Sequence, residues 1–201
     1  MAQKHIFIAL TGASGSMYCL RLAEQLCLNG FQVTFSASCS GTAVCLEETG
    51  LDLSGDLDKA RQRLYDHLEV KSGIKLVHPD DLFCGAASGS SAPDALVVCP
   101  CSMGTLARIA AGTSGNLIER CADVMLKERR PLLLVPRETP LSDIHLENML
   151  KLSRAGARII PAMPAFYGRP DSVLDLIDFV VGKILDQLGI ENNLYKRWGT
   201  E

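Results

Sequence analysis

The first 36 residues carry a strand, a glycine-rich turn, a helix and a second strand, and this succession constrains the fold most. The apolar run 4–10 ends in the turn TGASGS at 11–16, and apolar residues then recur with helical spacing as far as Asn29-Gly30. The alternating segment 31–36 is typical of a second strand. Two strands joined by a helix over so short a distance form a right-handed βαβ unit. The sequence therefore predicts a parallel α/β sheet.

The rest of the chain continues the alternation of strands and helices. Further strands are expected at 75–77, 94–99, 131–135 and 158–160, and helices at 41–49, 57–70, 102–111, 116–129, 142–155 and 172–188. Because neither a repeat nor a linker interrupts them, we expect a single domain over residues 1–201, with a tail from about 189. The predicted fold class is a three-layer, doubly wound α/β sheet.

Composition excludes several classes of protein. The 201 residues are 47% hydrophobic and 21% charged, which excludes extensive disorder, and the net charge of −3 disfavours a general nucleic-acid-binding protein. No apolar run approaches the roughly 20 residues that span a bilayer, and no signal-peptide pattern is present. We therefore expect a cytoplasmic protein without membrane insertion, whose eight cysteines are small buried thiols. Because no CxxC pair occurs and the four histidines are scattered, no metal site is expected.

Four distinctive loops directly follow predicted strands, at residues 11–16, 36–40, 100–105 and 136–140. In an open parallel sheet, the carboxyl ends of the strands form one edge, and ligands bind outside it. We therefore expect the four loops to converge on one site.

Two of these loops place hydroxyl groups, those of Ser14 and Ser102, at the start of a helix. Main-chain amides and the helix dipole favour an anion there, but an ordinary turn with a serine N-cap fits the same pattern. A serine-rich segment at 88–91 shifts the balance towards an anionic, ring-bearing ligand. Since the GxGxxG spacing is missing and no acidic residue stands out after the second strand, a mononucleotide such as FMN fits better than a dinucleotide.

Basic residues concentrate between positions 120 and 137, where five cations oppose two carboxylates. They are Arg120, Lys127, Arg129, Arg130 and Arg137, against Asp123 and Glu128. Arg120 and Lys127 lie seven residues apart and share a helix face, from which two cations can bind a phosphate. The pair at 129–130 is typical of a solvated helix face. We expect this basic segment to lie beside the helix N-termini of the sheet edge.

Three further residues have an ordinary structural explanation when only their spacing is considered. Glu138 follows a buried strand and fits either a salt-bridged carboxylate or a proton-transfer group, and spacing favours the former. By the same criterion, Tyr167 would close the core and Lys183 would be a solvated position on the last helix.

Five strings, in this order, closely resemble the flavin prenyltransferases of the UbiX type. They are TGASGS, ASGSSAP, CPCSMGTLARIAAG, NLIERCADVMLKERRPLLLVPRETPLSDIHLENML and PAFYGRP. The resemblance extends from about residue 5 to the RWG at 197–199, and the long string at 116–150 is its most specific part.

The resemblance implies a flavodoxin-like, Rossmann-like flavoprotein that forms a homo-oligomer, dodecameric in the family, and binds FMN at subunit interfaces. Members of the family join a dimethylallyl group from dimethylallyl phosphate to N5 and C6 of reduced FMN without a metal. The product, prenylated FMN, serves decarboxylases of the UbiD type, and the family is linked to ubiquinone biosynthesis.

The resemblance also implies roles for individual residues. The expected FMN contacts are Gly12, Ala13, Ser14, Ser38, Ser102, Met103, Gly104, Thr105 and Arg137. The expected prenyl-donor contacts are Lys127, Tyr167, Lys183, Ser88, Ser90 and Trp198, the last because aromatic residues are scarce. Glu138 is the candidate for proton transfer, and Arg120 and Glu48 fall at positions that the family uses near its site. The family commonly has arginine at position 183, and lysine there keeps the charge but loses the planar fork.

Two other functions fit parts of the pattern. An FMN-dependent cysteine decarboxylase of the related fold would share the cofactor loops, but its P-x-M-N substrate loop is absent and PAFYGRP takes a different form. A non-catalytic flavin carrier would keep the FMN loops as well. It would have no use for Lys127, Glu138 and Tyr167 together, so the prenyltransferase is favoured.

Overall fold

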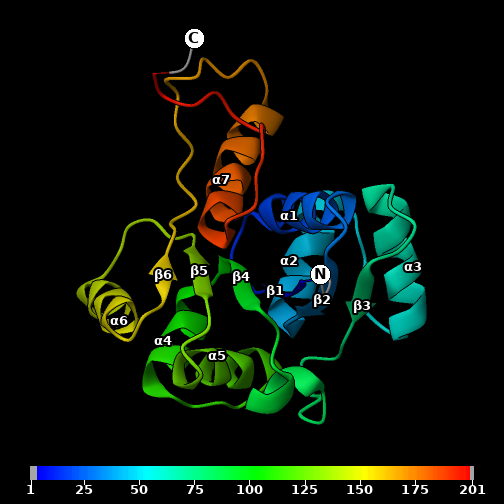
Figure 1. Ribbon diagram of the computed structural model, residues 1–201, viewed down its shortest axis with the longest axis vertical. Helices are drawn as coiled ribbons and strands as arrows, with labels where there is room; N and C mark the ends of the chain where they lie inside the picture. The colour runs from blue at the N-terminus through cyan, green and yellow to red at the C-terminus, as the bar shows by residue number, and fades with distance from the viewer. Residues whose placement is uncertain (1–3, 200–201) are drawn as a thin grey trace.

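A six-stranded sheet forms the centre of the computed structural model, which describes residues 4–199 (Figure 1). The strands are β1 (His5–Leu10), β2 (Gln32–Ala37), β3 (Ile74–Leu76), β4 (Ala95–Cys101), β5 (Leu132–Pro136) and β6 (Arg158–Ile159). Their order is β3-β2-β1-β4-β5-β6, and all pairings are parallel. This is the usual strand order of Rossmann-type sheets, and it places the topological switch point between β1 and β4.

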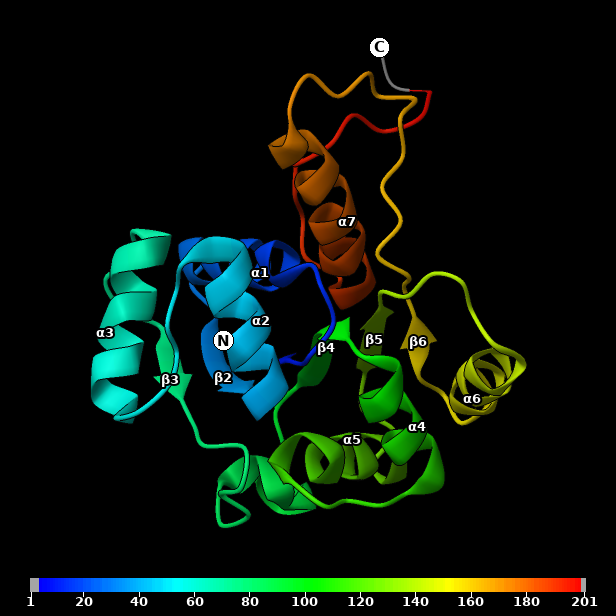
Figure 2. The same cartoon turned by 180° about the vertical axis from the view of Figure 1, so that it is seen from behind.

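Helices cover both faces of the sheet (Figures 1 and 2). One face packs on α1 (Ser16–Leu28), α2 (Cys39–Thr49), α3 (Leu57–Leu68) and α7 (Val173–Leu188). The other packs on α4 (Met103–Ala111), α5 (Leu117–Lys127), α6 (Asp143–Arg154) and the short 3-10 turn η1 (Gly85–Ala87), which η2 (Gly89–Ser91) follows. Alternate strand residues enter the two apolar layers, as Phe7 and Ile8 illustrate. The predicted three-layer, doubly wound architecture is confirmed.

The observed elements match the predicted ones closely, with differences at their ends. Strand β4 continues to Cys101, two residues beyond its expected end, and α5 ends at Lys127 rather than at 129. Arg129 has a φ of +54°, a left-handed conformation that does not continue a helix. Within residues 4–199, no helix is both long and apolar enough to cross a membrane.

Residues 160–199 form an arm that α7 anchors to the sheet and whose outer part projects from it. After β6 the chain leaves the sheet at residues 160–172, returns as α7 and then runs back along α7 (Figures 1 and 2). A bidentate pair between Arg21 and Asp178, with N–O distances of 2.7 and 3.0 Å, fixes α7 to α1. Beyond this anchor, Met163, Phe166 and Trp198 are 63%, 69% and 80% exposed. Exposed apolar side chains of this size indicate an interaction surface.

Candidate functional site

The loops that follow β1 and β4 are joined at the switch point of the sheet. The Thr11 hydroxyl donates to the carbonyl of Pro100 at 2.7 Å and accepts from the amide of Ser102 at 2.8 Å. The loop after β5 joins them, because Arg137 Nε donates to the carbonyl of Ser14 at 3.1 Å. The loop after β2 is equally close: a Cβ added at Gly12 would lie 2.5 Å from Ser40 Oγ. The predicted convergence of the four loops is confirmed.

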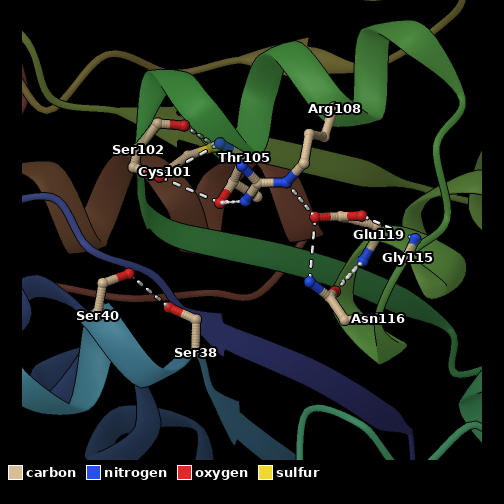
Figure 3. Close-up of polar contacts among 9 residues, drawn as sticks. All are labelled: Ser38, Ser40, Cys101, Ser102, Thr105, Arg108, Gly115, Asn116 and Glu119. Atoms are coloured by element: carbon tan, nitrogen blue, oxygen red, sulfur yellow. Dashed lines mark hydrogen bonds and ion pairs between the residues drawn. The ribbon is translucent and has the colours of Figure 1, made fainter.

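Two helix N-termini with serine caps meet at this edge. Ser38 Oγ accepts from the amide of Gly41 at 3.0 Å, and Ser102 Oγ accepts from that of Thr105 at 3.3 Å. Figure 3 shows the Ser38–Ser40 pair and the Ser102–Thr105 pair on either side of the dark blue chain that leaves β1. Both serines are therefore N-caps, and two positive helix ends face one edge of the sheet.

The N-terminus of α1 has a different partner, the carboxylate of Glu48. Its oxygens accept from the amides of Gly15, at 3.0 Å, and Ser16, at 2.8 Å. Burial alone would raise the pKa of Glu48, but hydrogen bonds from the Ser14 hydroxyl and from these two amides lower it. Contrary to the expectation that this turn offers free amides to a phosphate, a carboxylate of the same chain already binds two of them.

A buried carboxylate that sequence reasoning missed supports the Ser102 loop. Glu119 is 2% exposed and accepts hydrogen bonds from Arg108, from the amide of Gly115 at 2.8 Å and from the side chain of Asn116 at 3.0 Å. Arg108 also donates to Thr105 Oγ1 at 3.2 Å (Figure 3). The network ties the start of α4 to the start of α5. The spacing of Asn116 and Glu119, that of a capping box, was a signal that could have revealed it.

A second group of predicted residues lies at a different place, around Lys127. Lys127 Nζ lies 3.4 Å from the carboxylate of Glu128, and Glu128 packs so close to Gly89 that a Cβ there would lie 2.1 Å from it. Arg130, three residues after Lys127, donates to the carbonyls of Ala92 and Pro93, just before β4. This group therefore lies near the amino ends of the strands.

Arg120 belongs to the same group. It donates to the carbonyl of Ala87 at 3.2 Å and pairs with Asp123 at 2.8 Å, next to the loop that carries Ser88 and Ser90. The expectation that the whole basic segment lies beside the helix N-termini is therefore wrong within one chain. Of its five cations, Arg137 reaches the loops of the carboxyl edge, whereas α5 ends at Lys127, just before the start of β5.

A third group lies on the projecting arm. The ring of Tyr167 lies 5.2 Å from that of Trp198 and 5.9 Å from that of Phe179, both in edge-to-face contact. Lys183 lies over the rings of Phe179 and Tyr195. Among the described residues, no hydrogen bond, ion pair or ring contact joins the three groups to one another.

The sheet edge offers a donor set that fits a flavin mononucleotide. Hydroxyl groups of Ser14, Ser38 and Ser102, two helix N-termini and the Arg137 guanidinium suit a phosphate and the hydroxyls of a ribityl chain. Ser38 also lines a largely apolar groove of about 780 Å³ that runs past Leu46, Leu53 and His78. The residues present therefore fit the group that the sequence predicted.

Clustered metal ligands do not occur in the described part of the chain, and most of its thiols are buried. Residues 4–199 contain no group of three or more His, Cys, Asp or Glu side chains placed to hold a metal ion. All eight cysteines are free, and Cys19, Cys45, Cys99, Cys101 and Cys121 are buried. Burial raises the pKa of the Cys101 thiol to about 12, so this thiol next to the Ser102 loop stays protonated.

The fold and the donor groups at the carboxyl edge of the sheet define a doubly wound α/β protein whose site fits a mononucleotide. Comparisons with known proteins show the family to which it belongs. The family model described as Flavoprotein matches residues 1–185, so the chain belongs to the flavoproteins. The flavin prenyltransferase UbiX of Pseudomonas aeruginosa is 49% identical over 199 residues, covering 98% of this chain and 95% of the relative. The chain is thus a member of the flavin prenyltransferase family.

Solved structures agree with this assignment. AnUbiX (PadA1), solved in complex with FMN and dimethylallyl pyrophosphate, has a TM-score of 0.88 at 38% identity, covering 99% of both chains. A dodecameric FMN-dependent UbiX-like decarboxylase from Escherichia coli O157:H7 has a TM-score of 0.85 at 37% identity, covering 98% of this chain and 100% of that one. A PPC decarboxylase, 18% identical with a TM-score of 0.59, shares the fold alone.

Proposed function

We propose that this protein transfers a dimethylallyl group from dimethylallyl phosphate to N5 and C6 of reduced FMN. The full-length match to flavin prenyltransferases, at 49% identity, is the observation that carries the proposal. The cysteine decarboxylase alternative has less support, because proteins of that kind share the fold at 18% identity or less.

The proposed FMN site is the carboxyl edge of the sheet. The hydroxyls of Ser14, Ser38 and Ser102 and the guanidinium of Arg137 would bind the polar part of FMN. Residues 102–105 and the turn at 12–14 would border the ring, and the absent side chain at Gly12 lets this turn approach Ser40 in the loop after β2. When bound, reduced FMN supplies the electron-rich ring that accepts the prenyl group.

The prenyl donor would be bound by the other two groups. Cleavage of its carbon–oxygen bond leaves negative charge on the departing phosphate, which Lys127, Lys183 and the Tyr167 hydroxyl would stabilise. Such fixed donors supply what a divalent metal supplies elsewhere, so we propose a reaction that needs no metal. Ser88, Ser90 and Trp198 would border the prenyl chain.

Two carboxylates would act near the reacting atoms. Glu138 is exposed, and one of its oxygens accepts the amide of Thr139 at 3.0 Å, which leaves the other for proton transfer to or from the flavin. Glu48 fixes the turn at Ser14, and Arg120 contacts the loop of the prenyl pocket.

The proposed site requires several copies of the chain. Because Lys127, Tyr167 and the sheet edge lie apart within one chain, we propose that neighbouring subunits of a homo-oligomer bring them together, as a dodecamer. The exposed apolar arm is suited to reach a second copy, and a relative of known structure is dodecameric. We further propose that the product, prenylated FMN, passes to a UbiD-type decarboxylase in the cytoplasm, where free cysteines are the rule.

The test is anaerobic incubation with FMN, dithionite and dimethylallyl phosphate, followed by mass spectrometry of the flavin. The proposal predicts a flavin heavier by one dimethylallyl unit, and a parallel arm with dimethylallyl pyrophosphate identifies the preferred donor. An unchanged flavin mass with both donors would overturn the proposal. Tight FMN binding in that case favours the carrier, and release of CO₂ from a C-terminal cysteine peptide favours the decarboxylase.

A further inference from the structure

The ammonium group of Lys183 lies against two aromatic rings that contact each other, with centroids 5.1 Å apart. Its Nζ lies 5.5 Å from the centroid of the Phe179 ring, one turn earlier on α7, and 4.8 Å from that of Tyr195 in the tail. Both rings attract the cation electrostatically. Lysine is a flexible point charge, so confinement of this kind sets where its charge is presented.

One carboxylate fixes the tail to α7. Asp186 accepts hydrogen bonds from the side-chain amide of Asn192 at 2.9 Å and from the Tyr195 hydroxyl at 2.6 Å. Both terminal nitrogens of Arg197 donate to it as well, at 2.8 and 3.0 Å. These four donors occupy the acceptor sites of the carboxylate. Arg197, foremost among them, lowers the pKa of Asp186, which keeps it ionised.

Gly182 allows the tail ring to come this close to the helix. A Cβ added at Gly182 would lie 2.4 Å from the ring of Tyr195 and 3.0 Å from Asn192 Oδ1. Real side chains do not tolerate the first distance, so any larger residue displaces Tyr195. The position of the ring over Lys183 thus depends on a glycine one residue before the cation.

The carboxylate that fixes the tail is also a natural competitor for Lys183. Asp186 follows Lys183 by three residues, the spacing at which opposite charges pair on a helix surface. Such a pair would neutralise the cation. Within residues 4–199, however, Lys183 forms no ion pair, and Asp186 pairs with Arg197 instead.

We propose that Asn192, Tyr195 and Arg197 form a latch that occupies Asp186, keeps Lys183 out of an ion pair with Asp186 and thereby raises affinity for the phosphate of the prenyl donor. This inference rests on the proposed function, because it takes Lys183 as a phosphate-binding residue. The latch residues are positioning residues: they act on the substrate through Lys183. The device suits a lysine, whose single charged group a nearby carboxylate can easily capture.

The latch is tested with full-length protein loaded with oxidised FMN, which prevents turnover. In isothermal titration, Arg197→Gln should bind dimethylallyl phosphate at least about fivefold more weakly than the wild type, because Asp186 then pairs with Lys183. Adding Asp186→Asn to this variant removes the competitor and should restore the affinity to within about twofold of wild type. Arg61→Gln, which breaks an exposed ion pair with Asp58 on α3, is the control and should bind as wild type.

The double variant separates the latch from a merely structural tail. If the tail only supported the fold, Asp186→Asn would remove a further contact and weaken binding more than Arg197→Gln alone. The inference is overturned if Arg197→Gln binds dimethylallyl phosphate as the wild type does, or if adding Asp186→Asn does not restore the affinity. It is also overturned if the wild type does not bind dimethylallyl phosphate.

A spectroscopic measurement reports on the latch without the reaction. After the lysines are reductively methylated with a ¹³C label, Lys183→Arg identifies the NMR signal of Lys183. We expect ring currents of Phe179 and Tyr195 to shift this signal upfield of those of the other lysines. In Gly182→Ala, which displaces Tyr195, the signal should move towards those of the other lysines, and an unshifted signal in the wild type would contradict the geometry. If the signal, the binding and the rescue all behave as expected but no prenylated flavin forms, the latch stands and the proposed transfer fails.

Discussion

Glu48 provides the countercharge for the N-terminus of α1, and its removal should be measurable. We expect Glu48→Gln to lower the free energy of unfolding by about 1 kcal/mol, because an anion at a helix N-terminus and charge-assisted hydrogen bonds to Gly15 and Ser16 are lost. Urea unfolding of the variant and the wild type gives the difference. Glu47→Gln, an exposed neighbour on the same helix, is the matched control and should be neutral within about 0.5 kcal/mol.

The pH dependence of this effect has a definite sign. Since the folded pKa of Glu48 is lowered, its contribution is present above the ordinary value of 4.5 and disappears as the pH falls through the folded value. The difference between wild type and Glu48→Gln should therefore be complete at about pH 7 and shrink below about pH 4.5. An equal difference at about pH 3 would contradict this role.

Whether the role of a residue could be predicted from the sequence depended on how far apart in the sequence its contacts lie. Ser102 was predicted as an N-cap, because a cap and its amide lie three residues apart. The contact of Glu48 with Ser16 joins positions 32 residues apart, and no local pattern reveals it. The role of Glu119 lay between these cases, since its cap spacing is local but its contact with Arg108 depends on how α4 and α5 pack.

Helices α4 and α5 are joined by the buried Glu119, so this residue should matter for both stability and cofactor binding. We expect Glu119→Ala to lower the free energy of unfolding by about 2 kcal/mol, since buried donors lose their acceptor. FMN affinity should fall about threefold to tenfold, because Arg108 no longer holds Thr105 in the loop that we propose to bind FMN. Urea unfolding and quenching of FMN fluorescence on binding measure the two effects.

The control for this prediction is an exposed pair. Asp58→Ala removes the partner of Arg61 on α3, a surface contact of about 0.5 kcal/mol or less, and should leave FMN binding unchanged. Loss of stability in Glu119→Ala with full FMN affinity would show that the network supports the fold but not the loop.

At the scale of elements, the sequence was informative wherever apolar residues recur with a regular period. The buried runs that became β1, β4 and β5 and the amphipathic stretches that became α4 to α7 were all expected. Residues 160–172 carry no such period, so neither the projecting arm nor the return of the tail along α7 could be predicted. The latch around Asp186 joins α7 to this returning tail.

At the scale of the whole molecule, the spatial arrangement of the predicted site residues was the hardest feature to predict from the sequence. Residues implied by one resemblance turned out to occupy three separate places in one chain: the sheet edge, the surroundings of Lys127, and the arm with Tyr167 and Lys183. Spacing along a sequence cannot tell whether two residues meet within one copy or between two. Their separation here is the physical reason to expect a site built from several copies.

Subunit complementation tests this expectation directly. Lys127→Ala and Lys183→Ala should each bind FMN but lose prenyl transfer, because each removes a cation that we propose to bind the phosphate. If these lysines enter one site from different chains, oligomers co-assembled from equal amounts of both variants should regain activity in about a quarter of their sites, where each lysine comes from a chain that retains it. If both came from the same chain, no site in the mixed oligomer would hold both lysines and activity would stay absent. The separately purified variants, mixed without dissociation and reassembly, are the control and should remain inactive. Recovery in the co-assembled sample alone would therefore assign the two cations to different subunits.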